Sequence, residues 1–187
     1  MHNRVCPWWL GYILVSPLRR LLYDPQEILR PYVTEGMNVL DLGCGMGFFS
    51  LPAARMAGKT GKVVCVDLQE KMIKGLLRRS DKTGLSDRID ARVCRQDSLA
   101  LDDITGQIDF ALAFALIHEV PDKERFLSET SAAMKETGGL LIAEPKGHVS
   151  KEGFDKTVST ARHAGFKVVG DVSIRRSYAV LLGKQTI

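Results

Sequence analysis

Short apolar segments alternate along this chain with segments whose apolar residues recur at helical spacing. Asn38–Leu42 and Lys62–Val66 are apolar, and the stretch after the second segment places Met72, Leu76 and Leu77 on one helical face. Strands that are apolar almost throughout are typical of a parallel sheet covered by helices on both faces. The alternation therefore predicts an α/β fold with a doubly wound sheet.

The C-terminal part of the chain departs from this alternation. Its last two expected strands are joined by a link near Arg175–Ser177, which is too short for a parallel crossover, so they must pair antiparallel. We therefore expect the sheet to end in an antiparallel hairpin. Further strands are expected at residues 89–97, 108–116, 140–145, 166–174 and 177–184, and helices at residues 47–58, 69–84, 122–136 and 150–165.

A glycine-rich turn follows the first expected strand, in the segment VLDLGCGMGFFS. Ligands of open α/β sheets bind outside the carboxyl ends of the strands, so this turn is the expected site. Gly43, Gly45 and Gly47 read GxGxG, and Phe48 occupies the position where a dinucleotide fingerprint has its third glycine. A P-loop lysine is also missing. The spacing therefore favours a ligand that presses on the backbone without a diphosphate.

Two carboxylates at the ends of later strands support a nucleoside ligand. Asp67 ends the second strand and can accept hydrogen bonds from both hydroxyls of a ribose. Asp97 ends the third expected strand, where it can accept from an adenine amine while the backbone of Ser98 donates to a ring nitrogen. The competing interpretation is that both carboxylates cap helices. Together with the glycine turn, they predict an adenosine site without diphosphate.

The ordered segments VLDLGCGMG, VVCVDLQEKMI, CRQDSLA, IDFALAFALIHEVPD and GGLLIAEP resemble the motifs of class I S-adenosylmethionine-dependent methyltransferases. The closest resemblance is to the branch that includes quinone-biosynthesis enzymes, and it covers residues 36–183. It implies a Rossmann-like, mostly parallel seven-stranded sheet with a reversed C-terminal hairpin. It also implies S-adenosylmethionine as the cofactor. Because the chain is shorter than those quinone enzymes, the resemblance leaves the substrate class open.

The resemblance assigns the parts of the cofactor to particular residues. Asp41, Gly43 and Gly45 would line the methionine end, with Cys44 in the same loop. Asp67 would hold the ribose, Leu68 would pack on the adenine face, and Asp97 with Ser98 would hold the adenine edge.

His118, just after the fourth expected strand, is the candidate catalytic residue. A general base is needed only if the acceptor arrives protonated, as alcohols, phenols and carbon acids do. His118 has three competing interpretations: a base or substrate ligand, a loop residue that contacts the cofactor, or a structural residue. An HExxH zinc site is excluded because Asp122 stands at its second histidine position. Glu144 and His148, near the end of the fifth strand, are candidate substrate ligands.

The N-terminal segment, residues 1–35, is expected to be a cap before a cofactor-binding domain at residues 36–187. It concentrates aromatic residues, of which Trp9 and Tyr12 are candidate substrate contacts. Such an apolar patch is rarely left in water. The segment could pack on the sheet as a core helix, close over the cofactor as a lid, or lie on a membrane surface with Arg19 and Arg20 at the headgroups. We favour the lid, because no other segment would exclude water from the sulfonium.

Composition narrows the remaining functional classes. The net charge is +4, but the basic pairs are scattered, which does not favour a nucleic-acid track. The aromatic motif of methylases that act on base amines is absent after the fourth strand, where AFAL stands. Four cysteines without CxxC pairing indicate free thiols in a reducing cytoplasm and no structural metal. The N-terminal apolar run lacks a small-residue cleavage site and does not resemble a secretion signal.

The sequence therefore predicts a cytoplasmic enzyme that transfers a methyl group from S-adenosylmethionine to a small-molecule acceptor by in-line displacement. The main alternative is a non-catalytic protein of the same fold that binds S-adenosylmethionine or regulates a partner. An NAD-linked oxidoreductase is disfavoured by the glycine spacing. Arsenic methylation is disfavoured because three of the four cysteines lie in the glycine loop or in strands.

Overall fold

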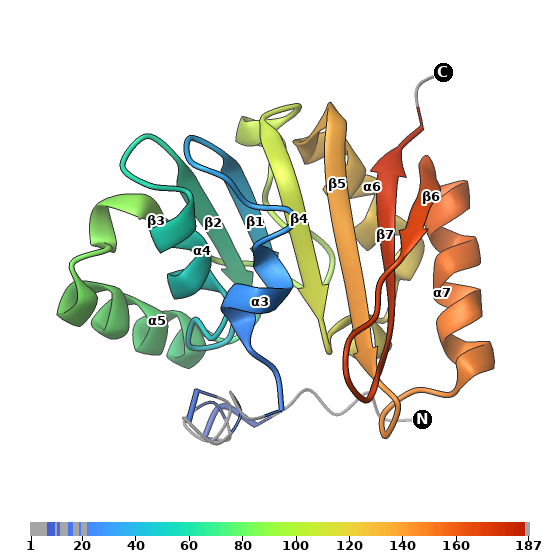
Figure 1. The fold of residues 1–187 in the computed structure, drawn as a ribbon, viewed down its shortest axis with the longest axis horizontal. Helices are drawn as coiled ribbons and strands as arrows, with labels where there is room; N and C mark the ends of the chain where they lie inside the picture. The colour runs from blue at the N-terminus through green and yellow to red at the C-terminus, as the bar shows by residue number, and fades with distance from the viewer. Residues whose placement is uncertain (1–6, 10, 12–14, 17–18, 20–21, 186–187) are drawn as a thin grey trace. The chain divides into compact units, whose positions relative to one another are not determined.

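The computed structural model describes residues 7–9, 11, 15–16, 19 and 22–185, and Figure 1 shows their arrangement. The strand order is β3-β2-β1-β4-β5-β7-β6 in a seven-stranded sheet, which confirms the predicted fold class. The strands are β1 (Asn38–Leu42), β2 (Lys62–Asp67), β3 (Ile89–Val93), β4 (Ile108–Phe114), β5 (Met134–Pro145), β6 (Phe166–Asp171) and β7 (Ser177–Lys184). The α-helices are α3 (Pro25–Leu29), α4 (Ser50–Met56), α5 (Glu70–Thr83), α6 (Lys123–Ala133) and α7 (Lys151–His163). The chain forms two compact units, residues 5–94 and residues 95–187.

The unit of residues 5–94 is built on three parallel strands in the order β3-β2-β1. Four consecutive residues in β2, Val63–Val66, are buried, which matches a strand covered on both faces. Asp41 of β1 lies opposite Cys65 of β2, near the carboxyl ends of both strands. This register places the glycine turn after β1 next to Asp67 at the end of β2.

Helix α5 packs its apolar face against these strands. Met72 and Leu76 are buried, as the sequence predicts, and Ile73 is buried with them, whereas Leu77, predicted on the same face, is 39% exposed. The helix ends at Thr83, and the φ of 65° at the following Gly84 is the left-handed conformation typical of a glycine after a helix. The apolar face of α5 therefore points toward the glycine turn, and the charged residues of the helix lie on its opposite face.

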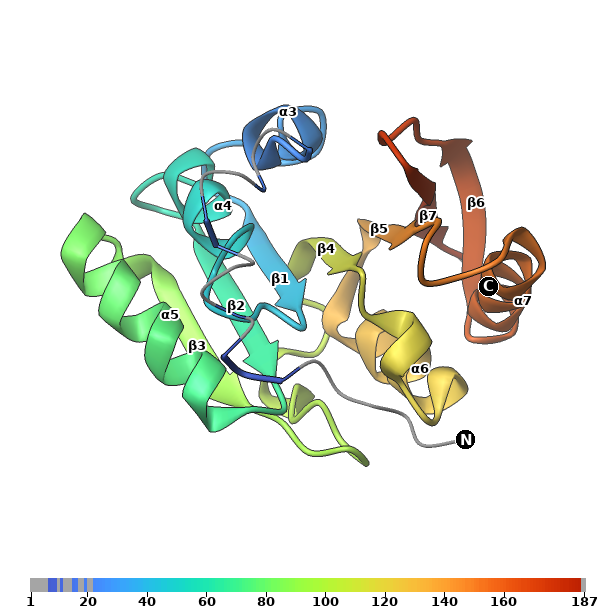
Figure 2. The ribbon, with the colours of Figure 1, turned by 90° about the horizontal axis from the view of Figure 1, so that it is seen from below.

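The unit of residues 95–187 contains β4 and β5 in parallel, followed by β7 and β6. Both pairings of β7 are antiparallel, so the predicted C-terminal hairpin is confirmed. Helices α6 and α7 pack against each other, and against β5 and the hairpin (Figure 2). Buried apolar residues of β5, Leu140–Ala143, form the centre of this unit.

Several element boundaries differ from the sequence-based prediction, and those of α6, β5 and β3 differ most. The helix expected to extend to residue 136 ends at Ala133, and β5 begins at once with Met134. Met134 is fully buried and pairs with Ile108 of β4, so strand pairing overrides the helical preference of the residues after it. The third strand ends at Val93, four residues earlier than expected.

No helix in the described part of the chain is long and apolar enough to cross a membrane.

Candidate functional site

The glycine turn leaves β1 and reverses beside the end of β2. The backbone nitrogens of Gly43 and Cys44 both donate to the carbonyl of Val66, at 2.9 and 3.1 Å. Gly47 has a φ of 84°, and a Cβ atom at this position would lie 2.4 Å from Cδ1 of Leu76. Only glycine permits α5 to approach the turn so closely.

Gly45 also has a left-handed backbone conformation, with a φ of 54°, but no side chain packs closely against it as Leu76 does at Gly47. A Cβ atom there would meet nothing closer than Sδ of Met72 at 4.0 Å. The backbone at Gly45 therefore has open space beside it, in contrast to the backbone at Gly47. A ligand can approach this part of the turn without displacing a side chain.

Asp67 ties the glycine turn to the start of α5. Its Oδ2 accepts a hydrogen bond from the nitrogen of Gly45 at 2.9 Å, and its Oδ1 accepts from the nitrogen of Gln69 at 2.9 Å. Burial raises the pKa of Asp67 despite these two donors. Each carboxylate oxygen has a second lone pair, so both can also accept from a ligand hydroxyl. Asp67 is thus a structural anchor with spare acceptor capacity.

Asp41 lies beneath the turn and is 4% exposed. The hydroxyl of Ser50 donates to its Oδ2 at 2.5 Å. Burial raises the pKa of Asp41 from an ordinary value of 3.8 to about 7, although the hydrogen bond from Ser50 lowers it; the nearby charge of Asp67 also raises this pKa, and that of Arg19 lowers it. The buried carboxylate of Asp41 and the half-buried carboxylate of Asp67 therefore make the turn a favourable place for a cation.

Cys44 and Leu68 complete the predicted residues of this unit. Cys44 is buried, and its Sγ donates to the carbonyl of Gly45 at 3.6 Å. Burial raises the pKa of the Cys44 thiol, so it remains a neutral thiol and not a nucleophilic thiolate. Leu68 is 36% exposed, which leaves an apolar side chain available to a flat ring.

The unit of residues 95–187 joins His118 to Glu144. The backbone nitrogen of His118 donates to Oε1 of Glu144 at 3.2 Å, and its Nδ1 lies 2.7 Å from Oε2. Glu144 belongs to β5 and is only 1% exposed, whereas the side chain of His118 is 22% exposed. The hydrogen bond to Glu144 is the main reason that the pKa of His118 is raised. The pair therefore resembles the oriented histidine of a general base.

His148 lies beside the same pair. Its ring centroid is 5.1 Å from that of His118 in an edge-to-face arrangement. Oε1 of Glu119 is 3.8 Å from Nε2 of His118. Within the described residues, no group of three or more acidic, histidine or cysteine side chains is arranged to hold a metal ion. The structure thus brings His118, Glu144 and His148 together, as candidate base and substrate ligands.

Asp97 and Ser98 lie in the loop after β3 and not at its end. Arg95 donates to Asp97 through Nε at 3.0 Å and through a terminal nitrogen at 2.9 Å. The Ser98 hydroxyl accepts a hydrogen bond from the nitrogen of Ala100 at 3.1 Å. The sequence-based predictions do not include this ion pair, although Arg95 and Asp97 carry opposite charges two positions apart. It lowers the pKa of Asp97, which is exposed.

The N-terminal segment is described only in part. Trp9 is 55% exposed, and Tyr12 lies outside the described residues. Trp8 lies under the ammonium of Lys71, 4.3 Å from the ring centroid. Gly11 is buried so tightly that an added Cβ would lie 2.7 Å from Sδ of Met72. Trp8 and Gly11 therefore lie against the first turn of α5, which sequence periodicity alone does not reveal.

A family model described as "Methyltransferase domain" matches residues 33–174, which is most of the chain. This chain belongs to the S-adenosylmethionine-dependent methyltransferases. The match includes the glycine turn, Asp67, Asp97, His118 and Glu144.

Curated relatives of this methyltransferase act in quinone biosynthesis, according to their names. The ubiquinone biosynthesis O-methyltransferase of Rhizobium etli is 36% identical over 136 residues, which are 73% of this chain and 50% of that protein. The ubiquinone/menaquinone biosynthesis C-methyltransferase of Escherichia fergusonii is 31% identical over 112 residues, 60% of this chain and 44% of that protein. The methyltransferase described here thus spans about half the length of these relatives.

Solved structures extend the likeness over nearly the whole chain. A SAM-dependent methyltransferase from Aquifex aeolicus superimposes with a TM-score of 0.85 at 25% identity, covering 95% of this chain and 98% of that one. Geranyl diphosphate C-methyltransferase from Streptomyces coelicolor superimposes with a TM-score of 0.71 at 15% identity, covering 95% and 84% of the two chains. The second likeness shows the fold alone.

The family's cofactor, S-adenosylmethionine, has a cationic sulfonium and a cationic α-amino group. The residues of the glycine turn fit such a group. Asp41 is buried and Asp67 half-buried, and both carboxyls have raised pKa values, so a nearby cation relieves the cost of their charge. The open backbone at Gly45 leaves space for a ligand, and the spacing disfavours a diphosphate.

Proposed function

We propose that this methyltransferase methylates a small acceptor that arrives with a proton on its reacting atom, with His118 as the general base. The observation that carries the proposal is the pair of hydrogen bonds between His118 and Glu144. A histidine that only filled a loop would not need a buried carboxylate on its Nδ1. The names of the curated relatives support an aromatic hydroxyl of a quinone precursor as the acceptor.

When bound, S-adenosylmethionine supplies an electrophilic methyl group on its sulfonium. Glu144 holds the proton of His118 on Nδ1, which leaves Nε2 with a lone pair. Nε2 would take the proton of the acceptor hydroxyl, which frees the oxygen for the methyl group, while the methyl–sulfur bond would break and leave a neutral thioether on the departing cofactor. The resulting imidazolium is stabilised by Glu144 and returns its proton to water after the methylated product leaves.

We further propose the division of cofactor contacts that the family resemblance implies. Asp67 accepts hydrogen bonds from the ribose hydroxyls, through the lone pairs that Gly45 and Gln69 do not use. Leu68 packs on the adenine, and Asp97 with Ser98 binds its edge. Asp41 acts through its charge, because its side chain is covered and bonded to Ser50. His148 and Trp9 remain proposed substrate contacts.

The proposal is tested by radiolabelled S-adenosylmethionine and a panel of catechols, phenols and carbon acids. We expect methyl transfer to a catechol or phenol, and its loss in His118→Ala while the cofactor still binds by calorimetry. Methyl transfer that is equally fast in His118→Ala would show that His118 is not the general base. Cofactor binding without turnover on any acceptor would support the non-catalytic alternative.

A further inference from the structure

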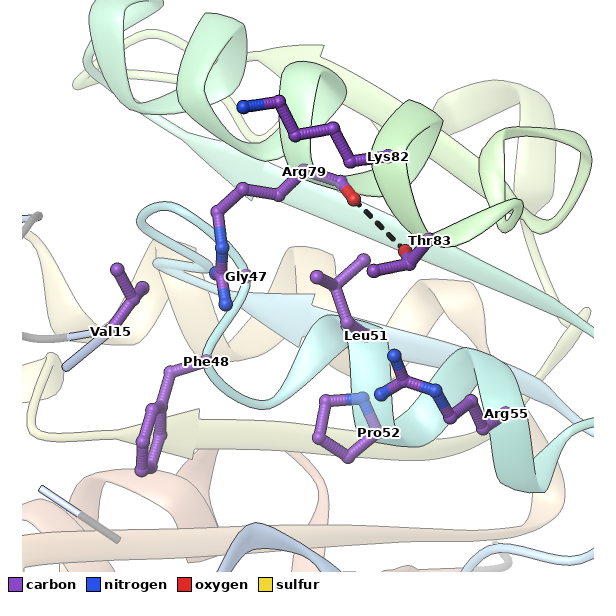
Figure 3. Close-up of a pocket in the computed structure, with 9 residues that line it drawn as sticks. All are labelled: Val15, Gly47, Phe48, Leu51, Pro52, Arg55, Arg79, Lys82 and Thr83. Atoms are coloured by element: carbon purple, nitrogen blue, oxygen red, sulfur yellow. Dashed lines mark hydrogen bonds between the residues drawn. The ribbon is translucent and has the colours of Figure 1, made fainter. Parts of the chain in front are cut away.

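Two loops carry proposed cofactor contacts, and in each of them a charged side chain from a helix bonds to the loop backbone. In the glycine turn, the guanidinium of Arg79 in α5 donates to the carbonyl of Met46, and Figure 3 shows this side chain running from α5 toward the turn. In the loop after β3, Oε2 of Glu129 in α6 accepts a hydrogen bond from the nitrogen of Leu99 at 2.6 Å. This second contact lies within the unit of residues 95–187, in the loop that carries the proposed adenine contacts.

The carboxylate of Glu129 is held at both of its oxygens. Its Oε1 accepts from Nε of Arg125, one helical turn earlier, at 3.0 Å, while its Oε2 accepts from Leu99. The side chain of Glu129 is 24% exposed, against 54% for that of Arg125. A half-buried carboxylate that is fixed at one oxygen presents the other oxygen to the loop in a defined position. Glu129 therefore connects the loop to a helix more rigidly than a fully exposed side chain would.

The residue after Leu99 has a strained backbone conformation. Ala100 has a φ of 54°, in the left-handed region that residues with a Cβ atom rarely adopt. Its nitrogen donates to Oγ of Ser98 at 3.1 Å, and the nitrogen before it, that of Leu99, donates to Glu129. Such conformations persist only where the surrounding contacts hold them. Glu129 thus helps to hold the loop in a conformation that its own sequence does not favour.

The loop keeps hydrogen-bonding capacity for a ligand at Asp97 and Ser98. Arg95 and Ser98 form a short antiparallel bridge, in which the nitrogen of Arg95 donates at 2.9 Å but the nitrogen of Ser98 makes only a long contact at 3.4 Å. The nitrogen of Ser98 can therefore still donate to a ring nitrogen. Asp97 accepts from Arg95 through both oxygens, and each oxygen has a second lone pair for an exocyclic amine.

We propose that Glu129 is a positioning residue for recognition of the adenine base. The peptide between Ser98 and Leu99 is planar, and both of its polar groups are bonded, the N–H to Glu129 and the carbonyl to the nitrogen of Arg95. These two bonds fix the orientation of Ser98 relative to α6, and with it the backbone nitrogen that meets the base. Glu129 acts through the loop and does not touch the cofactor. The inference rests on the proposed adenine contacts of Asp97 and Ser98.

The test is calorimetry with S-adenosylhomocysteine and S-inosylhomocysteine. The second ligand has a carbonyl in place of the exocyclic amine and a proton on the adjacent ring nitrogen, so it loses both adenine contacts but keeps the ribose and the amino acid. The wild type should prefer S-adenosylhomocysteine by at least about tenfold. Glu129→Ala should weaken binding of S-adenosylhomocysteine by at least about fivefold and that of S-inosylhomocysteine by less than about twofold, which reduces this preference.

Two further variants of α6 serve as rescue and control. Glu129→Gln keeps an oxygen that can accept from Leu99, so its affinity for S-adenosylhomocysteine should stay within about threefold of the wild type. Glu124→Ala removes a carboxylate from an exposed position of the same helix and should leave both affinities unchanged. Equal weakening of both ligands in Glu129→Ala would show a purely structural role and overturn the proposal. If Glu129→Ala does not fold, Glu129→Asp takes its place with the same expectations, because its carboxylate is one methylene further from the loop.

Asp97→Ala separates this proposal from the adenine contacts on which it rests. Loss of the preference in both Asp97→Ala and Glu129→Ala supports the contacts and the positioning role together. Loss in Asp97→Ala alone overturns the role of Glu129 and leaves the adenine contacts in place. A wild type that binds the two ligands equally well overturns the adenine contacts, and the role of Glu129 with them.

Discussion

Glu144 holds His118 at two points, accepting from its backbone nitrogen at 3.2 Å and contacting its Nδ1 at 2.7 Å. Because Glu144 is a buried residue of β5 and His118 lies in the loop after β4, this contact orients the loop side chain on a rigid strand. A proton held on Nδ1 selects the tautomer in which Nε2 is the base. The proposed role of His118 as a general base therefore depends on the carboxylate of Glu144.

Replacing Glu144 with Gln should move the titration of His118 to lower pH. The carboxylate raises the pKa of His118, and a neutral amide lacks that charge. A base acts in its neutral form, so the acidic limb of kcat should also shift to lower pH, with a lower plateau because the base is weaker. Histidine NMR titration and the pH profile of kcat measure both effects. Glu124→Gln, at an exposed position of α6, is the control, and an unshifted His118 titration in Glu144→Gln would contradict the assigned contact.

His118→Ala should reduce kcat by about 10²–10⁴, the usual contribution of a general base. Cofactor affinity should remain within about twofold, because the proposed cofactor residues do not include His118. Stopped-flow kinetics and calorimetry measure the two quantities on the same preparation. A parallel fall in both would instead support the interpretation of His118 as a cofactor contact.

The helices and strands are largely predictable from the sequence, whereas the side-chain contacts of the candidate site are not. The apolar strands and the short link before Ser177 determine the sheet and its hairpin through local patterns. The hydrogen bond between His118 and Glu144 joins residues 26 positions apart, and no periodic pattern in the sequence predicts it. The end of α6 at Ala133 was missed because pairing of Met134 with β4 is also non-local.

Asp41→Asn should stabilise the protein at pH 8 and change little at about pH 4, near the unfolded pKa of the carboxyl. The folded pKa of Asp41 is about 7, against an ordinary value of 3.8, so the folded state binds the proton more tightly. Wild-type stability therefore falls as pH rises between these values, and the neutral amide avoids this loss. Thermal unfolding should show a midpoint about 2–4 °C higher for each kcal/mol regained. An identical difference at both pH values would contradict the assigned titration.

The same substitution should weaken binding of S-adenosylmethionine, because it removes negative charge beneath the glycine turn. Asparagine can still accept from Ser50, so the turn should keep its geometry. Calorimetry at pH 8 measures the loss, and an affinity equal to that of the wild type would remove Asp41 from cofactor binding.

Asp67→Ala should weaken both the fold and the cofactor complex. It leaves the nitrogens of Gly45 and Gln69 without their acceptor, at a cost of about 1–3 kcal/mol for each group that stays buried. It also removes the proposed ribose acceptor, so affinity should fall at least about tenfold. Calorimetry at 10 °C, where the variant remains folded by circular dichroism, separates the two effects. A folded variant with wild-type affinity would leave Asp67 with its anchoring role alone.

The N-terminal segment should respond to the cofactor. Trp8 contacts Lys71, and buried Gly11 lies against Met72, so these two residues lie at the start of α5, which Asp67 also ties to the glycine turn. Cofactor that occupies the turn should therefore slow hydrogen exchange in peptides that contain Trp8 and Gly11. Removing residues 1–22 should leave a folded protein that has lost at least about 90% of its methyl transfer, because a lid excludes water from the reacting groups. Hydrogen-exchange rates that do not change when the cofactor binds would favour a permanent core helix. Full methyl transfer after the truncation would rule out the lid.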